Sequence, residues 1–381
     1  MRTISRLASG FLVAIAIAAG IALCGHLGTA RTAFAGGSFF FSPFLPLQVS
    51  TVPSNGDTTP YGLAFVPYGF PYGGSISPGE LLVSNFNNTT TAGQGTTIIT
   101  VNPETGATGL FFQGSSPIGF TNALTIARAG LVFGGSLPTS IGPPLTPLSG
   151  PLDVFNQNGN LLTSLGASDL VAGPWGMALN DLGTTAQLFV SNIFNPSDTS
   201  VFSGNITRLD VSLTSSGITV LDKYTIASGY TSATDATGTV VGPAGLAYDS
   251  YHDILYVASE GDDAIYKLTG AGSATSDLGT GTVVYNDETV LHGPLGLIFA
   301  PNGDLITANA DPSHFLPSPT DPSEIIEITR GGSFVREFSI DSAPGSAFAV
   351  DFNRNVPFGQ FVYVDDTLSN ATIWNLPGLA F

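Results

Sequence analysis

Cysteine, methionine and charged residues are all scarce in this chain of 381 residues. The sequence contains one cysteine and two methionines, and 10% of its residues are charged, against roughly 25% in an ordinary soluble protein. The single cysteine, Cys24, excludes a disulfide within the chain and a zinc site built from several thiolates. The low content of methionine and lysine leaves little material for long amphipathic helices.

Basic residues are the scarcer of the two charged classes. Ten Lys and Arg stand against 28 Asp and Glu, so the formal net charge is −18. A nucleic-acid-binding protein needs a basic face to meet the phosphates, so this class is excluded. Glycine loops of the Walker type, HExxH metalloprotease motifs and GxSxG nucleophile elbows are also absent from the sequence.

The rest of the composition favours strands and turns around a large core. Hydrophobic residues make up 43% of the chain and the mean hydropathy is +0.30, which excludes wholesale disorder. The 47 glycines and 26 prolines, together with Thr, Ser and Asn, separate short apolar runs, a pattern typical of strands joined by turns.

Residues 1–35 are typical of a signal peptide. Two arginines precede an apolar run at 11–24, and Ala33-Phe34-Ala35 places small residues at the positions that a signal peptidase reads. This run is short for a membrane span, and no later run reaches about 18 uninterrupted apolar residues. We therefore expect cleavage before Gly36, a secreted or periplasmic mature protein, and no membrane span after cleavage. An uncleaved membrane anchor is the alternative.

A turn that contains Gly or Asn, often with a preceding proline, recurs six times along the rest of the chain. Each copy continues as a short apolar run, a second apolar run that ends in a small or polar residue, and a third run after a loop. The key Gly or Asn positions are 62, 122, 176, 245, 296 and 345. Six units of four short strands are typical of a β-propeller.

The two ends of this repeat region complement one another. The sixth unit stops after its third run, near Trp374, whereas a spare run at 45–52 precedes the first turn. We therefore predict an all-β, six-bladed β-propeller with four-stranded blades over 45–376, whose ring is closed by the N-terminal strand. Residues 36–44 then form a short N-terminal arm and 377–381 a C-terminal tail. Enlarged loops are expected at 67–78, 136–149, 195–204, 229–240 and 311–322.

The best copies of the repeat lie at 242–268 and 293–328, with the cadence of a turn, the strand LYVAS, a loop and the strand AIYKL. These residues resemble the NHL-repeat propellers and the wider gluconolactonase-like and streptogramin-lyase-like group. The resemblance covers nearly the whole chain after residue 35 and implies the six-bladed fold. It leaves the function open, because the group contains lactonases, lyases and binding propellers without activity.

Strand polarity brings the ends of the second strands and the turns before the first strands to one mouth of the predicted channel. The side chains expected at that mouth are Asn85, Asn122, Trp175, Asn192, Glu260, His292, Asn309 and Asp365. Oxygen ligands predominate among them, and such ligands suit Ca²⁺ or Mg²⁺. The resemblance to the gluconolactonase-like group implies Glu260, Asn192 and Asn309 as metal ligands, and His292 could serve as a general base or a further ligand.

A structural role is open at each of these positions. Asn and Asp often end strands because their side chains hydrogen-bond to the neighbouring backbone in turns. A lone histidine in a turn is commonly just solvated, and Trp175 has packing between blades as its alternative to stacking on a ligand at the mouth.

Three classes of function remain. The first is an exported propeller that binds a small molecule, a glycan or a protein. The alternative is a divalent-metal-dependent, lactonase-like hydrolase or lyase with its site at the channel mouth, and the third class is a structural protein of the envelope or matrix. We expect a monomer.

Overall fold

The computed structural model describes residues 45–115, 117–234, 240–287, 289–309, 324–343, 345–354 and 359–376. The predicted signal peptide at 1–35, the arm at 36–44, the tail at 377–381 and the expected loop at 311–322 lie outside these residues. In the part of the chain that is described, no helix is long and apolar enough to cross a membrane.

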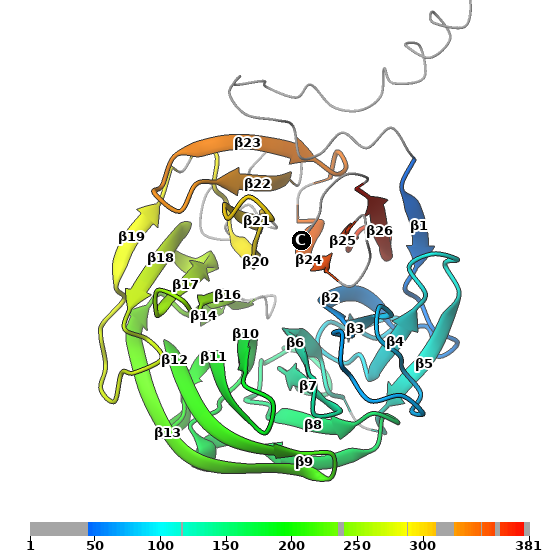
Figure 1. Ribbon diagram of the computed structural model, residues 1–381, viewed down its shortest axis with the longest axis horizontal. Helices are drawn as coiled ribbons and strands as arrows, with labels where there is room; N and C mark the ends of the chain where they lie inside the picture. The colour runs from blue at the N-terminus through cyan, green and yellow to red at the C-terminus, as the bar shows by residue number, and fades with distance from the viewer. Residues whose placement is uncertain are drawn as a thin grey trace, which may run out of the picture.

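Six four-stranded antiparallel sheets surround a central axis, and Figure 1 looks down this ring. Blade 1 contains β2 (Thr58–Phe65), β3 (Leu81–Asn87), β4 (Thr97–Val101) and β5 (Thr108–Gln113). Blade 2 contains β6 (Phe120–Ala127), β7 (Leu131–Ser136), β8 (Leu152–Asn156) and β9 (Leu161–Leu165). Blade 3 contains β10 (Pro174–Asp181), β11 (Thr185–Asn195), β12 (Asp198–Thr214) and β13 (Gly217–Tyr230).

The second half of the ring repeats this order. Blade 4 contains β16 (Pro243–Asp249), β17 (Ile254–Ser259), β18 (Ala264–Thr269) and β19 (Thr282–Tyr285). Blade 5 contains β20 (Pro294–Phe299), β21 (Leu305–Asn309), β22 (Glu324–Ile328) and β23 (Phe334–Ser339). Blade 6 contains β24 (Ala347–Asn353), β25 (Gln360–Asp365), β26 (Asn370–Asn375) and β1 (Leu47–Ser50). The predicted six-bladed, all-β propeller is confirmed.

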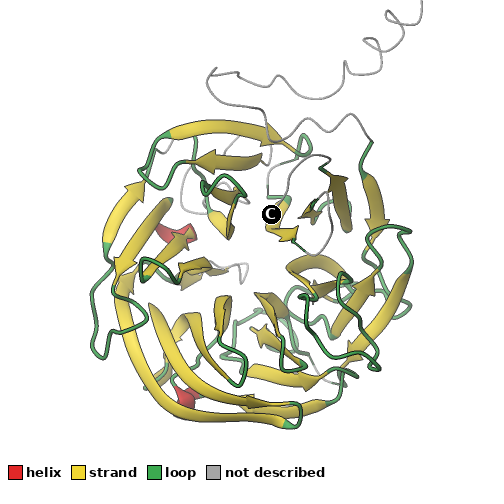
Figure 2. Cartoon of the chain, in the orientation of Figure 1, coloured by secondary structure: helices red, strands yellow, loops and turns green. Residues whose placement is uncertain are grey.

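Short additional elements decorate the ring. Strands β14 (Ala233–Thr234) and β15 (Val240–Val241) form a small ribbon before blade 4, and Ala167–Asp169 and Glu260–Asp262 form 3₁₀ turns, drawn red in Figure 2. The prediction of a loop at 195–204 is wrong for most of this stretch. β11 and β12 continue through this stretch as a long hairpin, because Phe194 and Phe202 pair across it with ring centroids 4.6 Å apart.

Blade 6 contains both ends of the described chain. β1 is its outermost strand and pairs with β26, with Leu47 opposite Ile373 and Ser50 opposite Asn370. Thr51 follows directly, and its backbone N–H donates to Ser369 O at 2.9 Å. The Asn85 amide of blade 1 donates to Thr51 O at 3.1 Å. The segment after β1 therefore links blade 6 to blade 1.

Small residues allow the innermost strands of neighbouring blades to approach closely. A Cβ atom on Gly176 would lie 2.0 Å from Ala244 O, and one on Gly245 would lie 2.1 Å from Leu295 O. Both distances are far inside van der Waals contact, so any side chain here would push two blades apart. These are the glycines of the recurring turn in the sequence, and their common role is to let backbones meet across the blade boundary.

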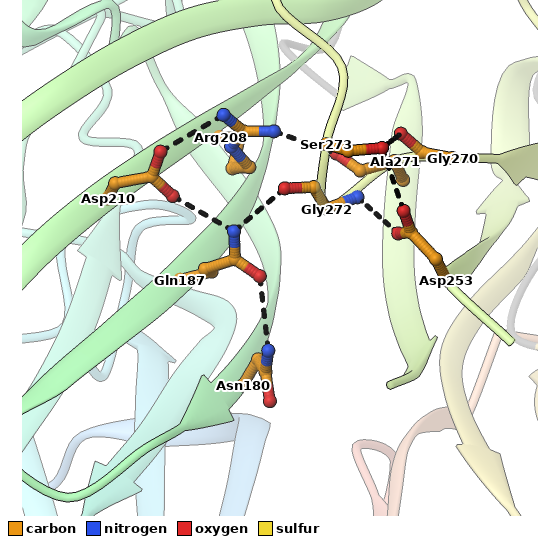
Figure 3. A network of polar contacts seen from close by, with 9 residues as sticks. All are labelled: Asn180, Gln187, Arg208, Asp210, Asp253, Gly270, Ala271, Gly272 and Ser273. Carbon is orange, nitrogen blue, oxygen red and sulfur yellow. Dashed lines mark hydrogen bonds and ion pairs between the residues drawn. The ribbon is translucent and has the colours of Figure 1, made fainter. Parts of the chain in front are cut away.

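Polar side chains reinforce the boundary between blades 3 and 4 (Figure 3). Arg208 on β12 is buried, donates to Asp210 on its own strand at 3.0 Å and reaches Ala271 O of blade 4 at 3.3 Å. Gln187 on β11 donates to both Asp210 and Gly272 O, at 3.1 and 2.8 Å. The network fixes the loop after β18 against blade 3.

Removal of residues 45–52 should destabilise the whole ring. The loss exposes the edge of β26 and removes the link from Ser369 through Thr51 to Asn85. We expect a melting temperature lower by about 5 °C or more, or aggregation, in a thermal unfolding experiment. Leu45→Ser, at a side chain that is 93% exposed, is the control and should melt like the wild type. An unchanged melting curve for the shortened chain would contradict the role assigned to β1.

Candidate functional site

One residue from each innermost strand precedes a small residue, which is the glycine of the recurring turn in blades 1, 3, 4 and 5 and Ala123 or Ala349 in blades 2 and 6, one and four residues beyond the predicted positions 122 and 345. These six residues are Tyr61, Asn122, Trp175, Ala244, Leu295 and Phe348. Trp175, Ala244, Leu295 and Phe348 belong to one apolar cluster and Tyr61 packs against it, although these residues come from five different blades. Residues of five blades can meet only near the axis, so these side chains, near the beginning of the innermost strands, lie at one end of the central channel.

Aromatic rings fill that end of the channel. The ring of Tyr61 lies 4.2 Å from Phe348, 4.6 Å from Phe86 and 5.6 Å from Trp175, centroid to centroid. We call these four residues the aromatic plug. Trp175 is 2% exposed, and its indole nitrogen has no hydrogen-bond acceptor among the described residues. Packing in the plug thus replaces the predicted role of Trp175 at an open mouth.

A cavity of about 170 Å³ lies at the other end of the same strands. Every blade contributes to its wall, chiefly through Leu63, Leu124, Met177, Leu246, Leu297 and Val350. Asn122, Thr125 and Asp351 supply the polar side chains. The channel therefore contains a cavity whose wall combines apolar side chains with polar groups, and the aromatic plug lies at the opposite end of the same strands.

Asp351 is the carboxyl group of this pocket. Its Oδ2 accepts a hydrogen bond from the backbone N–H of Phe65 in blade 1 at 3.0 Å, and its Oδ1 accepts from Phe352 N at 2.7 Å. Burial raises the pKa of Asp351 to about 6, against the opposing effect of the two backbone donors. At neutral pH the pocket therefore holds a carboxyl group that gains and loses its proton readily.

Three of the four predicted asparagines, Asn85, Asn192 and Asn309, lie at or near the ends of second strands, and each hydrogen-bonds to the segment that precedes the innermost strand of its blade. Asn192 Oδ1 accepts from Ala172 N at 2.9 Å, and its amide donates to Leu170 O at 3.1 Å. Asn309 Oδ1 accepts from His292 N, and its amide donates to Val290 O at 3.0 Å. Asn85 donates to Thr51 O. All three fasten the segment that precedes the innermost strand.

Of the remaining predicted residues, His292 is brought to Asn309 through its backbone N–H, and the turn that holds Glu260 adjoins it, because Asp263 Oδ1 accepts from Gly293 N at 2.7 Å. Glu260 is 3% exposed in the 3₁₀ turn after β17, and its N–H donates to Gly242 O. Asp365 is buried and accepts from Leu368 N at 3.0 Å. His292 lies in the turn before β20, and Asn122 lines the cavity.

The predicted metal ligands do not fit a shared cation in this arrangement. The amide oxygens of Asn192 and Asn309, which would have to ligate the ion, accept backbone N–H groups of blades 3 and 5. Among the residues described, no three His, Cys, Asp or Glu side chains lie together as a metal site would require.

Sequence reasoning missed the plug and Asp351. The residue that precedes the glycine or alanine of each turn is visible in the sequence, and comparing the six copies would have shown an almost entirely apolar set. Asp351 immediately follows Val350 in the apolar run of the sixth copy. An acidic residue in a strand of this kind is unusual enough to have been singled out.

Comparison with solved structures identifies similar propellers. A gluconolactonase from Xanthomonas campestris has a TM-score of 0.52 and 14% identical residues, with 93% of this chain and 92% of that chain covered. A luciferin-regenerating enzyme has a TM-score of 0.47 and 11% identity over 88% of this chain and 97% of that chain. A proposed oxidoreductase (glucose dehydrogenase) from Thermus thermophilus has a TM-score of 0.49 and 14% identity over 86% and 99% of the two chains.

No protein-family model matches the sequence, and no curated protein matches it either. At the identity found for the gluconolactonase, the likeness establishes the propeller fold alone.

Asp351 predicts a specific dependence of stability on pH. Its pKa in the folded protein is above the ordinary value of 3.8, so the folded state holds the proton more tightly than the unfolded state. The free energy of unfolding therefore falls as the pH rises from about 4 to about 6, by up to roughly 3 kcal/mol from this group. Asp366, whose pKa is also raised by burial to about 6, acts in the same direction.

Asp351→Asn should remove the first of these contributions. We expect the stability of the variant relative to wild type to be greater at pH 7 than at pH 4, measured by urea unfolding at both pH values. Glu104→Gln, at an exposed side chain, should show no such difference. Equal effects of Asp351→Asn at the two pH values would refute a raised pKa.

Proposed function

We propose that this protein is a gluconolactonase-like propeller that binds one small ring compound in the channel cavity. The observation that carries the proposal is the cavity itself, whose wall comes from all six blades and carries the polar side chains of Asn122, Thr125 and Asp351. We further propose, from the signal-like segment at 1–35, that it acts as a monomer in the periplasm or outside the cell.

The size of the cavity limits the ligand. An apolar cavity of about 150 Å³ accommodates benzene, and this cavity is about 170 Å³. A glycan chain or a protein segment is therefore too large, and a single ring with one or two polar atoms is the class that fits. A neutral lactone is such a compound, since its carbonyl oxygen can accept from the Asn122 amide or from protonated Asp351.

Binding of a lactone probe tests this proposal. We expect δ-valerolactone to perturb the cavity residues in NMR spectra, and Asn122→Leu, which keeps the volume and removes the amide, to weaken binding by about tenfold. Asn160→Leu, at an exposed asparagine outside the channel, is the matched control and should bind like wild type. No saturable perturbation, or equal affinities of wild type and Asn122→Leu, would remove the channel as the ligand site.

A divalent-metal-dependent hydrolase or lyase is the second candidate, favoured by the fold that the chain shares with a gluconolactonase. Glu260 is the charged residue among the ligands implied by resemblance, so Glu260→Gln removes the anchor and keeps the shape. Because the neighbouring amides are occupied, we expect calorimetric titrations with Ca²⁺ and Mg²⁺ to give the same result for wild type and Glu260→Gln. Binding that is lost in Glu260→Gln, with lactone hydrolysis that requires the ion, would establish the enzyme instead.

A further inference from the structure

A second hollow, of about 340 Å³, lies outside the channel where the turns of blades 4 and 5 meet. Tyr248, Asp249, Tyr251, Phe299, Arg330 and Arg354 line it, and we call it the arginine groove. Its volume falls within the range of about 300–1,000 Å³ that is usual for small-molecule sites. The neighbouring residue Ile298 belongs to the channel wall, so both hollows lie on the side of the ring opposite the plug.

The concentration of positive charge in this groove is unusual for the chain. Only ten of the 381 residues are Lys or Arg, in a sequence of net charge −18, yet two arginines line one hollow. Arg330 Nη1 pairs with Asp249 at 2.6 Å, and Asp249 also pairs with His252 at 2.7 Å. The nearby carboxylates of Asp304 and Glu327 bond to Asn302 at 3.0 Å. Glu327 also pairs with Arg336 Nε at 2.6 Å. Among the described residues Arg354 makes no ion pair, so its guanidinium is the group of the groove that is left for an anion.

Both guanidinium groups are held in place by the same residue. Arg330 lies over the ring of Phe299, with its Cζ 4.6 Å from the centroid, and its Nε donates to Gly303 O at 2.5 Å. Arg354 Nη2 donates to Phe299 O at 3.2 Å. Arginines fixed by stacking and backbone contacts lose little further freedom when they bind an anion.

Aromatic rings form the rest of the groove. Tyr251 is 89% exposed, and its ring meets the His252 ring at 85° with centroids 4.7 Å apart. Tyr248 is fixed from behind, because its hydroxyl donates to Asp253 at 2.9 Å and Asp253 in turn accepts from Gly272 N and Ser273 Oγ (Figure 3). An exposed aromatic face beside fixed polar groups suits the C–H face of a sugar ring.

We propose that the arginine groove binds a sugar acid of hexose size, with its carboxylate on Arg354 and Arg330 and its ring against Tyr251. Planar guanidinium groups match a carboxylate in shape and charge. A polymer of sugar acids is disfavoured because its further carboxylates would approach the acidic surface of a chain of net charge −18 within the Debye length of about 8 Å, where repulsion is not screened. The proposal stands independently of ligand binding in the channel.

Calorimetry with defined sugars tests the groove in the full-length protein. The probes are glucuronate, a cyclic acid, gluconate, an open-chain acid, and glucose, a neutral sugar of the same size. We expect at least one acid to bind and glucose to bind at least about tenfold more weakly. Whichever acid binds more tightly identifies the cyclic or the open-chain form as the ligand.

Two variants and a matched control locate the binding. Arg354→Gln should weaken binding of the acid by about tenfold or more. Tyr251→Ala should weaken binding of the acid several-fold, and the acid should still bind more tightly than glucose. Arg128→Gln, at a half-exposed arginine of blade 2 that pairs with Asp181, should leave the affinity unchanged. Equal losses in Arg128→Gln and Arg354→Gln, equal binding of glucose and the acids, or acetate binding as tightly as glucuronate would overturn the proposal. Asn122→Leu leaves the groove intact, so failure of channel binding and failure of groove binding are separate results.

Discussion

The close approach of the innermost strands is the constraint on which the rest of this structure depends. At Gly176 and Gly245 the backbone of the next blade occupies the space of a side chain, with carbonyl oxygens about 2 Å from where a Cβ would be. This contact sets the spacing of the blades. It also leaves the residue before each glycine, such as Trp175 or Leu295, at the narrow end of the axis, where five blades share one apolar cluster.

The two ends of the channel differ in their environment, although the same six innermost strands line both. At the narrow end the side chains are large and interlock, so Tyr61 touches partners from three blades and no space remains for a ligand. At the other end Leu63 and its equivalents stand far enough apart to leave a cavity. Asp351 sits there at the boundary of blades 6 and 1, and its bond to Phe65 N makes one carboxyl group both a link in the ring and a polar group of the pocket.

The sequence predicted the fold far better than the site, and particular residues explain the difference. Glycine at 62, 176, 245 and 296 is required by backbone contact, so the turn had to recur and the six units could be counted. The hydrogen bonds of Asn192 and Asn309 depend instead on where the chain passes before β10 and β20. The sequence does not distinguish an asparagine at a strand end that ligates an ion from one that hydrogen-bonds to the neighbouring backbone. The arginine groove joins residues 249 and 354, which no local pattern connects.

The channel and the groove differ in the charge that they can accept, although they open on the same side of the ring. A cavity that already contains a carboxyl group of raised pKa disfavours an anion, because a second negative charge beside Asp351 would be repelled and poorly solvated. The groove has two fixed guanidinium groups and one shared carboxylate, so it favours an anion and gains little from a neutral ring. The two hollows therefore differ in the charge that each favours, so a ligand proposed for one is not expected to compete for the other.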